Sequence, residues 1–172
     1  MGKEKAVSNT GPIIHLSEIK AKKALKIFSS IFCPLSVQKE LSNYIDTSET
    51  RFLKTKKLNQ SHKQLSEMLH VRFEISPAEA EAIALCKQAG IKIFLTDDLG
   101  ARIVSKKFGR TPVGSIGILL RAFREKILSQ SQAIKFLEEL EYKSSLFITP
   151  DLIKEAIQQA EKFSKKQPKS LL

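Results

Sequence analysis

Short apolar segments alternate along this chain with longer segments whose apolar residues recur at helical spacing. The β-branched and aromatic runs predict strands, and the segments between them predict amphipathic helices. The predicted strands are 5–9, 31–33, 71–75, 91–95 and 111–114, and the predicted helices include 36–45, 80–89, 115–126, 130–140 and 150–163. Because helices of this length connect strands by βαβ crossovers, we expect an α/β fold: a three-layer α/β/α sandwich with a central parallel sheet.

Three stretches are less regular. Residues 10–12 are interpreted as a turn with Pro12 at the first helical position, and the helix after it continues or restarts through Phe28. Residues 46–60 are polar, rich in lysine and weakly periodic, which indicates an excursion with a short helical piece, either a lid or a basic contact surface. With no internal repeat or dividing linker, residues 1–165 are expected to form a single domain and 166–172 a basic C-terminal tail.

Polar residues stand where the predicted strands end. Asp97 and Asp98 directly follow the strand 91–95, and Asn9 ends the first strand. Glu40 lies at the start of the helix after the second strand, beside its apolar face, and Glu79 opens the helix before the strand 91–95. If the strand that ends in Asn9 and the one that ends before Asp97 are neighbours in the sheet, these side chains meet in the crevice beyond the strand ends, where ligands bind in open parallel sheets.

Crowded carboxylates raise one another's pKa, and a bound divalent cation is the usual resolution. Oxygen ligands without histidine or thiolate select a hard ion, Mg²⁺ or Mn²⁺. The net charge of +11 and the pI of about 9.7 favour a polyanionic partner such as nucleic acid. A basic protein with an acidic metal pocket therefore indicates a nuclease.

Each candidate also has a structural interpretation that the sequence leaves open. Glu79 stands three residues after Ser76 and completes the pattern of a capping box. One residue of the Asp97–Asp98 pair would suffice to cap the following helix, and Glu40 would pair with a nearby lysine. Glu81, two residues after Glu79, is expected to face solvent. The basic run Arg102, Lys106, Lys107 and Arg110 is interpreted as a solvated face or as a phosphate contact.

The chain shows no signal peptide or membrane-spanning run, so we expect a cytoplasmic protein with no membrane partner. Cys33 and Cys86 have neither zinc-site nor redox-pair spacing and are expected to be reduced core thiols.

Four motifs carry a resemblance to a known family, in this order along the chain. They are Val7-Ser8-Asn9-Thr10-Gly11-Pro12-Ile13-Ile14-His15-Leu16, then Pro34-x-x-Val37-x-x-Glu40-Leu41, then Ser76-x-x-Glu79-Ala80-Glu81-Ala82-Ile83-Ala84-Leu85, then Leu95-Thr96-Asp97-Asp98 with Ala101-Arg102. With this spacing the chain resembles the PIN-domain family, and within it a prokaryotic group of VapC-type toxins whose first motif reads Ser-Asp or Ser-Asn, then a small residue and Pro.

The resemblance implies a PIN-domain endoribonuclease that hydrolyses RNA phosphodiesters with Mg²⁺ or Mn²⁺. It also implies a homodimer and a small antitoxin protein as partners, as in a toxin–antitoxin pair. By position, the family's acidic residues fall on Asn9, Glu40, Glu79 and Asp97, with Asp98 beside the last.

Asn9 departs from the family pattern, in which this position is usually an aspartate. An amide offers a neutral oxygen and removes one charge from the site, so metal affinity is expected to fall. The alternative function is therefore a catalytically impaired PIN-like module that binds nucleic acid or a partner protein. A phosphotransfer receiver of flavodoxin-like fold also places acids at strand ends, but it requires an early acidic cluster, which Glu4 and Asn9 supply poorly.

Overall fold

A computed structural model describes residues 2–166. The chain forms two compact units. Within the described residues, the first comprises 2–14 and 28–115, and the second comprises 15–27 and 116–166. Two helices, α1 (Thr10–Glu18) and α6 (Ser115–Arg124), begin in the first unit and continue into the second.

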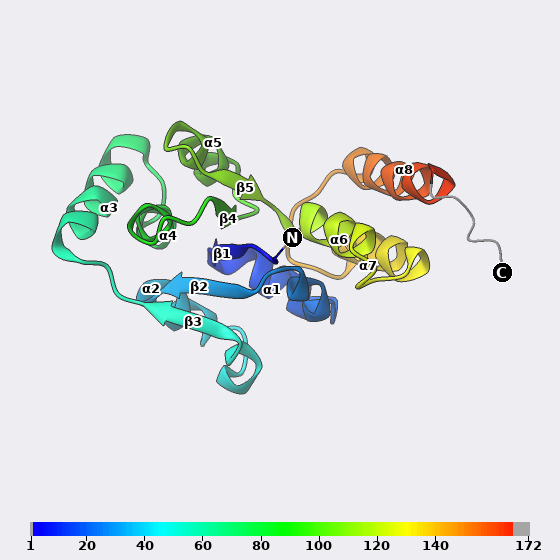
Figure 1. The fold of residues 1–172 in the computed structure, drawn as a ribbon, viewed down its shortest axis with the longest axis horizontal. Coiled ribbons are helices and arrows are strands. Elements are labelled where there is room, and N and C mark those ends of the chain that lie inside the picture. Colours follow the sequence, from blue (N-terminus) through cyan, green and yellow to red (C-terminus); the bar gives the residue numbers. More distant parts are fainter. Residues whose placement is uncertain (1, 167–172) are drawn as a thin grey trace. The chain divides into compact units, whose positions relative to one another are not determined.

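A parallel sheet forms the centre of the first unit (Figure 1). Its strands, among the described residues, are β1 (Lys5–Ser8), β2 (Ser30–Pro34), β3 (Leu53–Lys56), β4 (Ile93–Leu95) and β5 (Thr111–Val113), in the spatial order β3-β2-β1-β4-β5. In register, Val7 pairs with Phe32 on one side and with Phe94 on the other. The strands ending before Asn9 and Asp97 are therefore neighbours at the middle of the sheet, as the convergence of the polar residues requires.

The helices of the first unit supply the apolar side chains that cover this sheet. They are α2 (Leu35–Leu41), α3 (Gln60–Phe73), α4 (Pro77–Gln88) and α5 (Leu99–Lys107), with a 3-10 turn η2 at Thr47–Thr50. The alanine-rich helix α4 packs against β1, β2 and β4, where fully buried Ile83 and Leu85 join Val7 and Phe94 in one core. A parallel sheet with flanking helices confirms the predicted three-layer α/β/α class.

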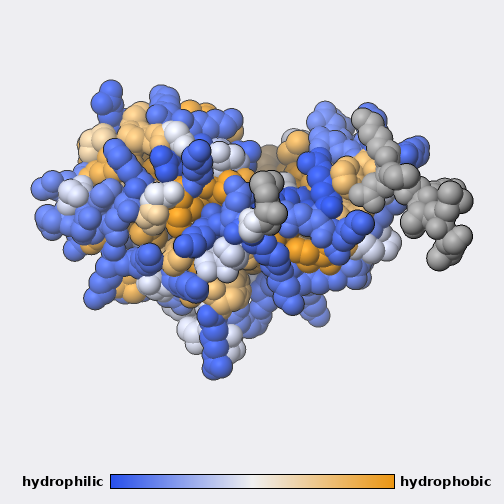
Figure 2. All heavy atoms as spheres, viewed as in Figure 1, coloured by the Kyte–Doolittle hydropathy of each residue, from blue (hydrophilic) through white to orange (hydrophobic). Residues whose placement is uncertain are grey.

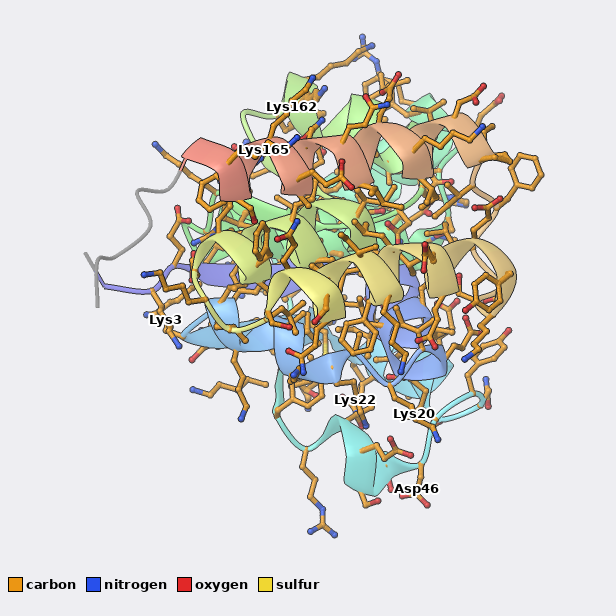
Figure 3. The ribbon with its side chains drawn as sticks, turned by 90° about the vertical axis from the view of Figure 1, so that its right-hand side faces the viewer. Lys3, Lys20, Lys22, Asp46, Lys162 and Lys165 are labelled. Atoms are coloured by element: carbon orange, nitrogen blue, oxygen red, sulfur yellow. The ribbon has the colours of Figure 1, made fainter. Side chains whose placement is uncertain are left out.

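The second unit is helical. Besides the continuations of α1 and α6, it contains the 3-10 helix η1 (Lys22–Ile27), α7 (Gln130–Tyr142) and α8 (Pro150–Lys166). The rings of Phe123 and Phe163 meet edge to face with their centroids 5.6 Å apart. Lys162 and Lys165 project from the last turns of α8 (Figure 3) and are exposed. Lys166 ends this helix, and the rest of the predicted basic tail, 167–172, lies outside the described residues.

The strand β3 lies within the stretch that the sequence predicts to be a polar excursion. It pairs with β2 at the edge of the sheet, and Leu53 is its one buried residue. An edge strand is hydrogen-bonded on one side only and exposes most of its side chains, so the polar sequence Leu-Lys-Thr-Lys gives no alternating pattern. The excursion thus contains a strand as well as the short helical turn η2.

The predicted strand at 71–75 is wrong. Helix α3 continues to Phe73 and ends at Glu74, whose φ of 53° is left-handed. The ring of Phe73 meets that of Phe108 edge to face, Ile75 is buried, and Val71 is 77% exposed. An alternation over only five residues matches the last turn of a helix and its exit as well as it matches a strand.

Helix α2 is shorter than predicted. It ends at Leu41, with Ser42 as its C-cap, and Tyr44 is 68% exposed rather than part of an apolar face. Glu40 therefore lies near the end of a two-turn helix. In the predicted helix 36–45 it would have been in the first half.

The two cysteines are free and fully buried, as expected for core thiols. Burial raises the pKa of Cys33 to about 11 and that of Cys86 to about 12, so both remain protonated at neutral pH. Among the described helices, none combines the length and the apolar character needed to cross a bilayer.

Candidate functional site

The ends of three neighbouring strands define one edge of the sheet. The parallel ladder continues one residue beyond the strands: Asn9 N–H donates to Leu95 O at 2.9 Å, and Thr96 N–H donates to Val113 O at 3.0 Å. These bonds bring Asn9, Asp97 and Gly114 to the same edge, each at the point where its strand ends. We call this edge, with Glu40 and Glu79 beside it, the acidic edge.

Asn9 is buried and joined to Glu79. Its amide Nδ2 donates to Glu79 Oε1 at 3.4 Å, and its Oδ1 accepts from Thr10 N–H at 2.7 Å. The amide therefore supplies a hydrogen-bond donor where an aspartate would bring a second carboxylate against Glu79. In this chain, the hydrogen bond from a neutral amide stabilises the Glu79 carboxylate.

Thr10 links the same strand end to Glu40. This residue is 4% exposed, and its hydroxyl donates to Glu40 Oε2 at 2.8 Å. Within the described residues the partner of Glu40 is thus Thr10 and not a lysine, although the glutamate side chain is otherwise exposed. The predicted turn at 10–12 is wrong, because α1 already begins at Thr10. Sequence reasoning missed Thr10, whose only signal is its position next to Asn9.

Glu79 has both of the roles that the sequence left open. Its Oε2 accepts from Ser76 N–H at 2.8 Å and Ser76 Oγ accepts from Glu79 N–H at 3.2 Å, a complete capping box. Its other oxygen faces Asn9. Burial raises the pKa of Glu79 and the charge of Asp98 raises it further, against the opposing effect of the hydrogen bonds from Ser76 and Asn9.

Asp97 is held rigidly by Ser115. The backbone N–H and the hydroxyl of this serine donate to the two carboxylate oxygens, each at 2.6 Å, and Ser115 is fully buried. Arg102 Nη1 donates to Thr96 O at 3.3 Å, next to the same carboxylate. Sequence reasoning did not assign a role to Ser115, and the contact is invisible to periodicity because 18 residues separate it from Asp97.

Asp98 is the helix cap of the pair. Its Oδ1 accepts from Ala101 N–H at 2.7 Å, so it is the N-cap of α5, and the residue is exposed. Asp98 thus acts on the acidic edge through its charge on Glu79 rather than through a contact with Asn9 or Glu40.

Replacing Asp98 with alanine should destabilise the fold by about 1 kcal/mol relative to Asp98→Asn, because only asparagine keeps an oxygen that accepts from Ala101 N–H. Both variants remove the same charge, so the difference between their free energies of unfolding in urea isolates the cap. Equal values for the two variants would contradict the capping role.

Glu81 is not the solvent-facing residue that the sequence predicted. It is half-buried, and its Oε2 accepts from Ser36 Oγ at 2.6 Å, which ties α4 to the first turn of α2. Glu79 and Glu81 thus contact different partners from the same helix.

The oxygen donors of the acidic edge match a hard divalent cation in kind, since no histidine or thiolate is among them. Glu79 and Asp98 repel each other, and a bound cation would offset this repulsion. Within residues 2–166, however, no three acidic, histidine or cysteine side chains are grouped closely enough to hold a metal. An ion at this edge would therefore need neutral oxygen ligands as well, and the amide oxygen of Asn9, next to Glu79, is such an oxygen.

The fold and this edge define an α/β protein with its polar site at the carboxyl ends of a parallel sheet. The chain belongs to the PIN-domain family: a family model described as PIN domain matches residues 5–162. Proteins of this family are generally nucleases, typically dependent on divalent metal ions. Searches of curated proteins and of solved structures found no match.

Proposed function

We propose that this protein is a metal-dependent endoribonuclease that acts at the acidic edge. The observation that carries the proposal is the pair of contacts at the end of β1, where Asn9 meets Glu79 and Thr10 meets Glu40. Asp97 lies two residues beyond the end of the neighbouring strand β4. Carboxylates among Glu40, Glu79 and Asp97 would hold Mg²⁺ or Mn²⁺ together with the amide oxygen of Asn9, since no three acidic side chains of the described residues lie close enough to hold the ion by themselves. When bound, the ion would lower the pKa of a water molecule and offset charge on a phosphodiester.

The chain's own residues have separable parts in this proposal. The two hydrogen bonds from Ser115 keep Asp97 in one orientation, and the capping box does the same for Glu79. The excess of basic side chains would bind the RNA backbone. Figure 2 shows hydrophilic residues over much of one face, with apolar residues between them.

The resemblance to VapC-type toxins extends the proposal to the biological role and the partners of the protein. In that case the protein is the toxin of a toxin–antitoxin pair, acts as a homodimer and is neutralised by a small antitoxin protein. These partners rest on the resemblance alone.

A second candidate is a PIN-like module that binds nucleic acid or a partner protein without cleaving RNA. The observation that favours it is the hydrogen bond from Asn9 Nδ2 to Glu79, because it satisfies within the protein a carboxylate that a catalytic ion would otherwise bind. This module would keep the basic surface and lose the ion.

Cleavage and binding of RNA, measured together, separate the two candidates. The nuclease predicts cleavage by the native protein with Mg²⁺ or Mn²⁺, loss in EDTA, and a rate at least about 100-fold lower for Asp97→Asn. Glu67→Gln, which changes an exposed carboxylate on α3, is the matched control and should cleave like the native protein. If the native protein binds RNA but cleaves none with either Mg²⁺ or Mn²⁺, the result would instead support the second candidate.

A further inference from the structure

A cavity lined by lysines lies at the carboxyl edge of the same sheet, in the first compact unit. Its volume is about 450 Å³. It opens where β2 and β3 end and α2 begins, and its walls come from α2, α3, α4 and the segment after β3. The lining residues are Pro34, Leu35, Ser36, Lys39, Lys56, Lys57, Leu58, Lys63 and Glu81.

The charge of this cavity is strongly positive. Four lysines line it against one glutamate, and Glu81 already accepts a short hydrogen bond from Ser36. Within the described part of the chain none of the four ammonium groups has a carboxylate partner in an ion pair. Lys56 Nζ lies over the ring of Phe32, 4.6 Å from its centroid, which holds this side chain at the cavity without neutralising it. The cavity thus offers several unpaired cations to an anion.

The helices that build the acidic edge also build this cavity. On α2, Lys39 lines the cavity and the next residue, Glu40, accepts the hydrogen bond from Thr10. On α4, Glu81 lines the cavity and Glu79, two residues earlier, contacts Asn9. Both sites also lie at the carboxyl ends of strands of one sheet, the acidic edge at β1 and β4 and the cavity at β2 and β3, so a chain molecule bound at the acidic edge extends towards the lysines with a neighbouring unit.

We propose that this cavity binds a backbone phosphate of single-stranded RNA, adjacent to the phosphodiester at the acidic edge. The inference rests on the proposed function, whose substrate class it makes specific. Compact ammonium groups on flexible stems suit phosphate, and no aromatic ring is among the lining residues to stack on a base. The contact is accordingly independent of base sequence and serves to position the strand.

The test compares two double variants of equal net charge. Lys39→Gln with Lys57→Gln removes two cations of the cavity, and Lys87→Gln with Lys92→Gln removes two exposed lysines elsewhere in the same unit. Binding of a short fluorescein-labelled single-stranded RNA is followed by anisotropy in EDTA, so that cleavage plays no part. The cavity variant should bind more weakly. Its plot of log affinity against log salt should also be less steep, by about 0.7 for each phosphate that the cavity no longer neutralises. The control variant should keep both the affinity and the slope of the native protein.

Equal affinities and slopes for the two variants, or no RNA binding by the native protein, would overturn the proposal. Displacement of the RNA by a nucleoside monophosphate at comparable concentration would also overturn it, because the occupant would then be a free nucleotide. Failure of the proposed function looks different: the native protein would then bind RNA through the cavity and cleave none with Mg²⁺ or Mn²⁺. Thermal unfolding of each variant checks that the fold is intact.

Discussion

Replacing Asn9 with aspartate should make the stability of this protein depend on divalent cations. The substitution removes the donor that now faces Glu79 Oε1 at 3.4 Å and puts a carboxylate in its place. A buried carboxylate at position 9 and the half-buried carboxylate of Glu79 at such a separation repel each other by up to about 5 kcal/mol at an effective dielectric constant near 20. Uptake of a proton by one of them would lower this cost. A bound Mg²⁺ or Mn²⁺ would remove the repulsion, because both carboxylates would then be ligands of the ion.

Thermal unfolding in EDTA and in increasing Mg²⁺ or Mn²⁺ measures this effect. Asn9→Asp should unfold at a lower temperature than the native protein in EDTA and should gain about 2.7 kcal/mol of stability at an ion concentration 100 times the Kd. Asn9→Ala is the matched control, because it removes the same hydrogen bond without adding charge. If Asn9→Asp is as stable as the native protein in EDTA and does not respond to either ion, residue 9 and Glu79 do not form a cation site. A gain of RNA cleavage in Asn9→Asp alone would support the impaired module as the native state.

The layout of the acidic edge was predictable because it follows from the sheet. A polar residue directly after a buried strand lies at the carboxyl edge, and β1 and β4 are neighbours, so the approach of Asn9 to the strand end that carries Asp97 needed no tertiary detail. The capping box at Ser76 and Glu79 was equally local, since both partners lie within one turn. These predictions used only rules that act over a few residues or over one strand.

Contacts between distant side chains were not predictable in this way. The bond from Thr10 to Glu40 joins residues 30 apart, and the bonds from Ser115 to Asp97 join residues 18 apart. The two partners of each bond lie in different elements of the chain, so a period within one helix or strand does not signal them. The assignment of Asp98 rather than Asp97 to the cap depends on these same bonds, which occupy both oxygens of Asp97.

The lysine-rich stretch 46–60 illustrates a different limit. Its low periodicity hid β3, whose exposed residues have no need to alternate, and yet Lys56 and Lys57 reach the cavity because pairing with β2 fixes where this strand ends. The sequence left a lid and a basic contact surface as alternatives for this stretch. The cavity supports the second of them.

Gly114→Ala should lower RNA cleavage and stability together. A Cβ at this position would lie 2.7 Å from Asp97 Oδ1 and 3.0 Å from Arg102 Nη1. A free carboxylate would move aside at little cost, but both oxygens of Asp97 are bonded to Ser115, so its displacement stretches or breaks those bonds. We expect a loss of about 1–3 kcal/mol in the free energy of unfolding. We also expect the cleavage rate to fall about 100-fold for a displacement of about 1 Å at the site.

Gly100→Ala separates this effect from the general cost of a methyl group. Its Cβ would meet only Asp98 Oδ1 at 3.2 Å and Ile75 Cγ2 at 3.8 Å, and alanine is the better helix former by about 1 kcal/mol in α5. Asp98 Oδ1 also accepts from Ala101 N–H, so it needs to move by only a few tenths of an ångström, and this small cost opposes the gain in helix propensity. This control should therefore unfold within about 1 kcal/mol of the native protein and should cleave at the native rate. If Gly114→Ala matches it in both measurements, Asp97 moves without consequence, and the orientation that Ser115 gives this carboxylate is not part of the active site. If stability falls while cleavage is unchanged, the bonds from Ser115 serve the fold, and the nuclease must draw its acidic ligands from Glu40 and Glu79 instead.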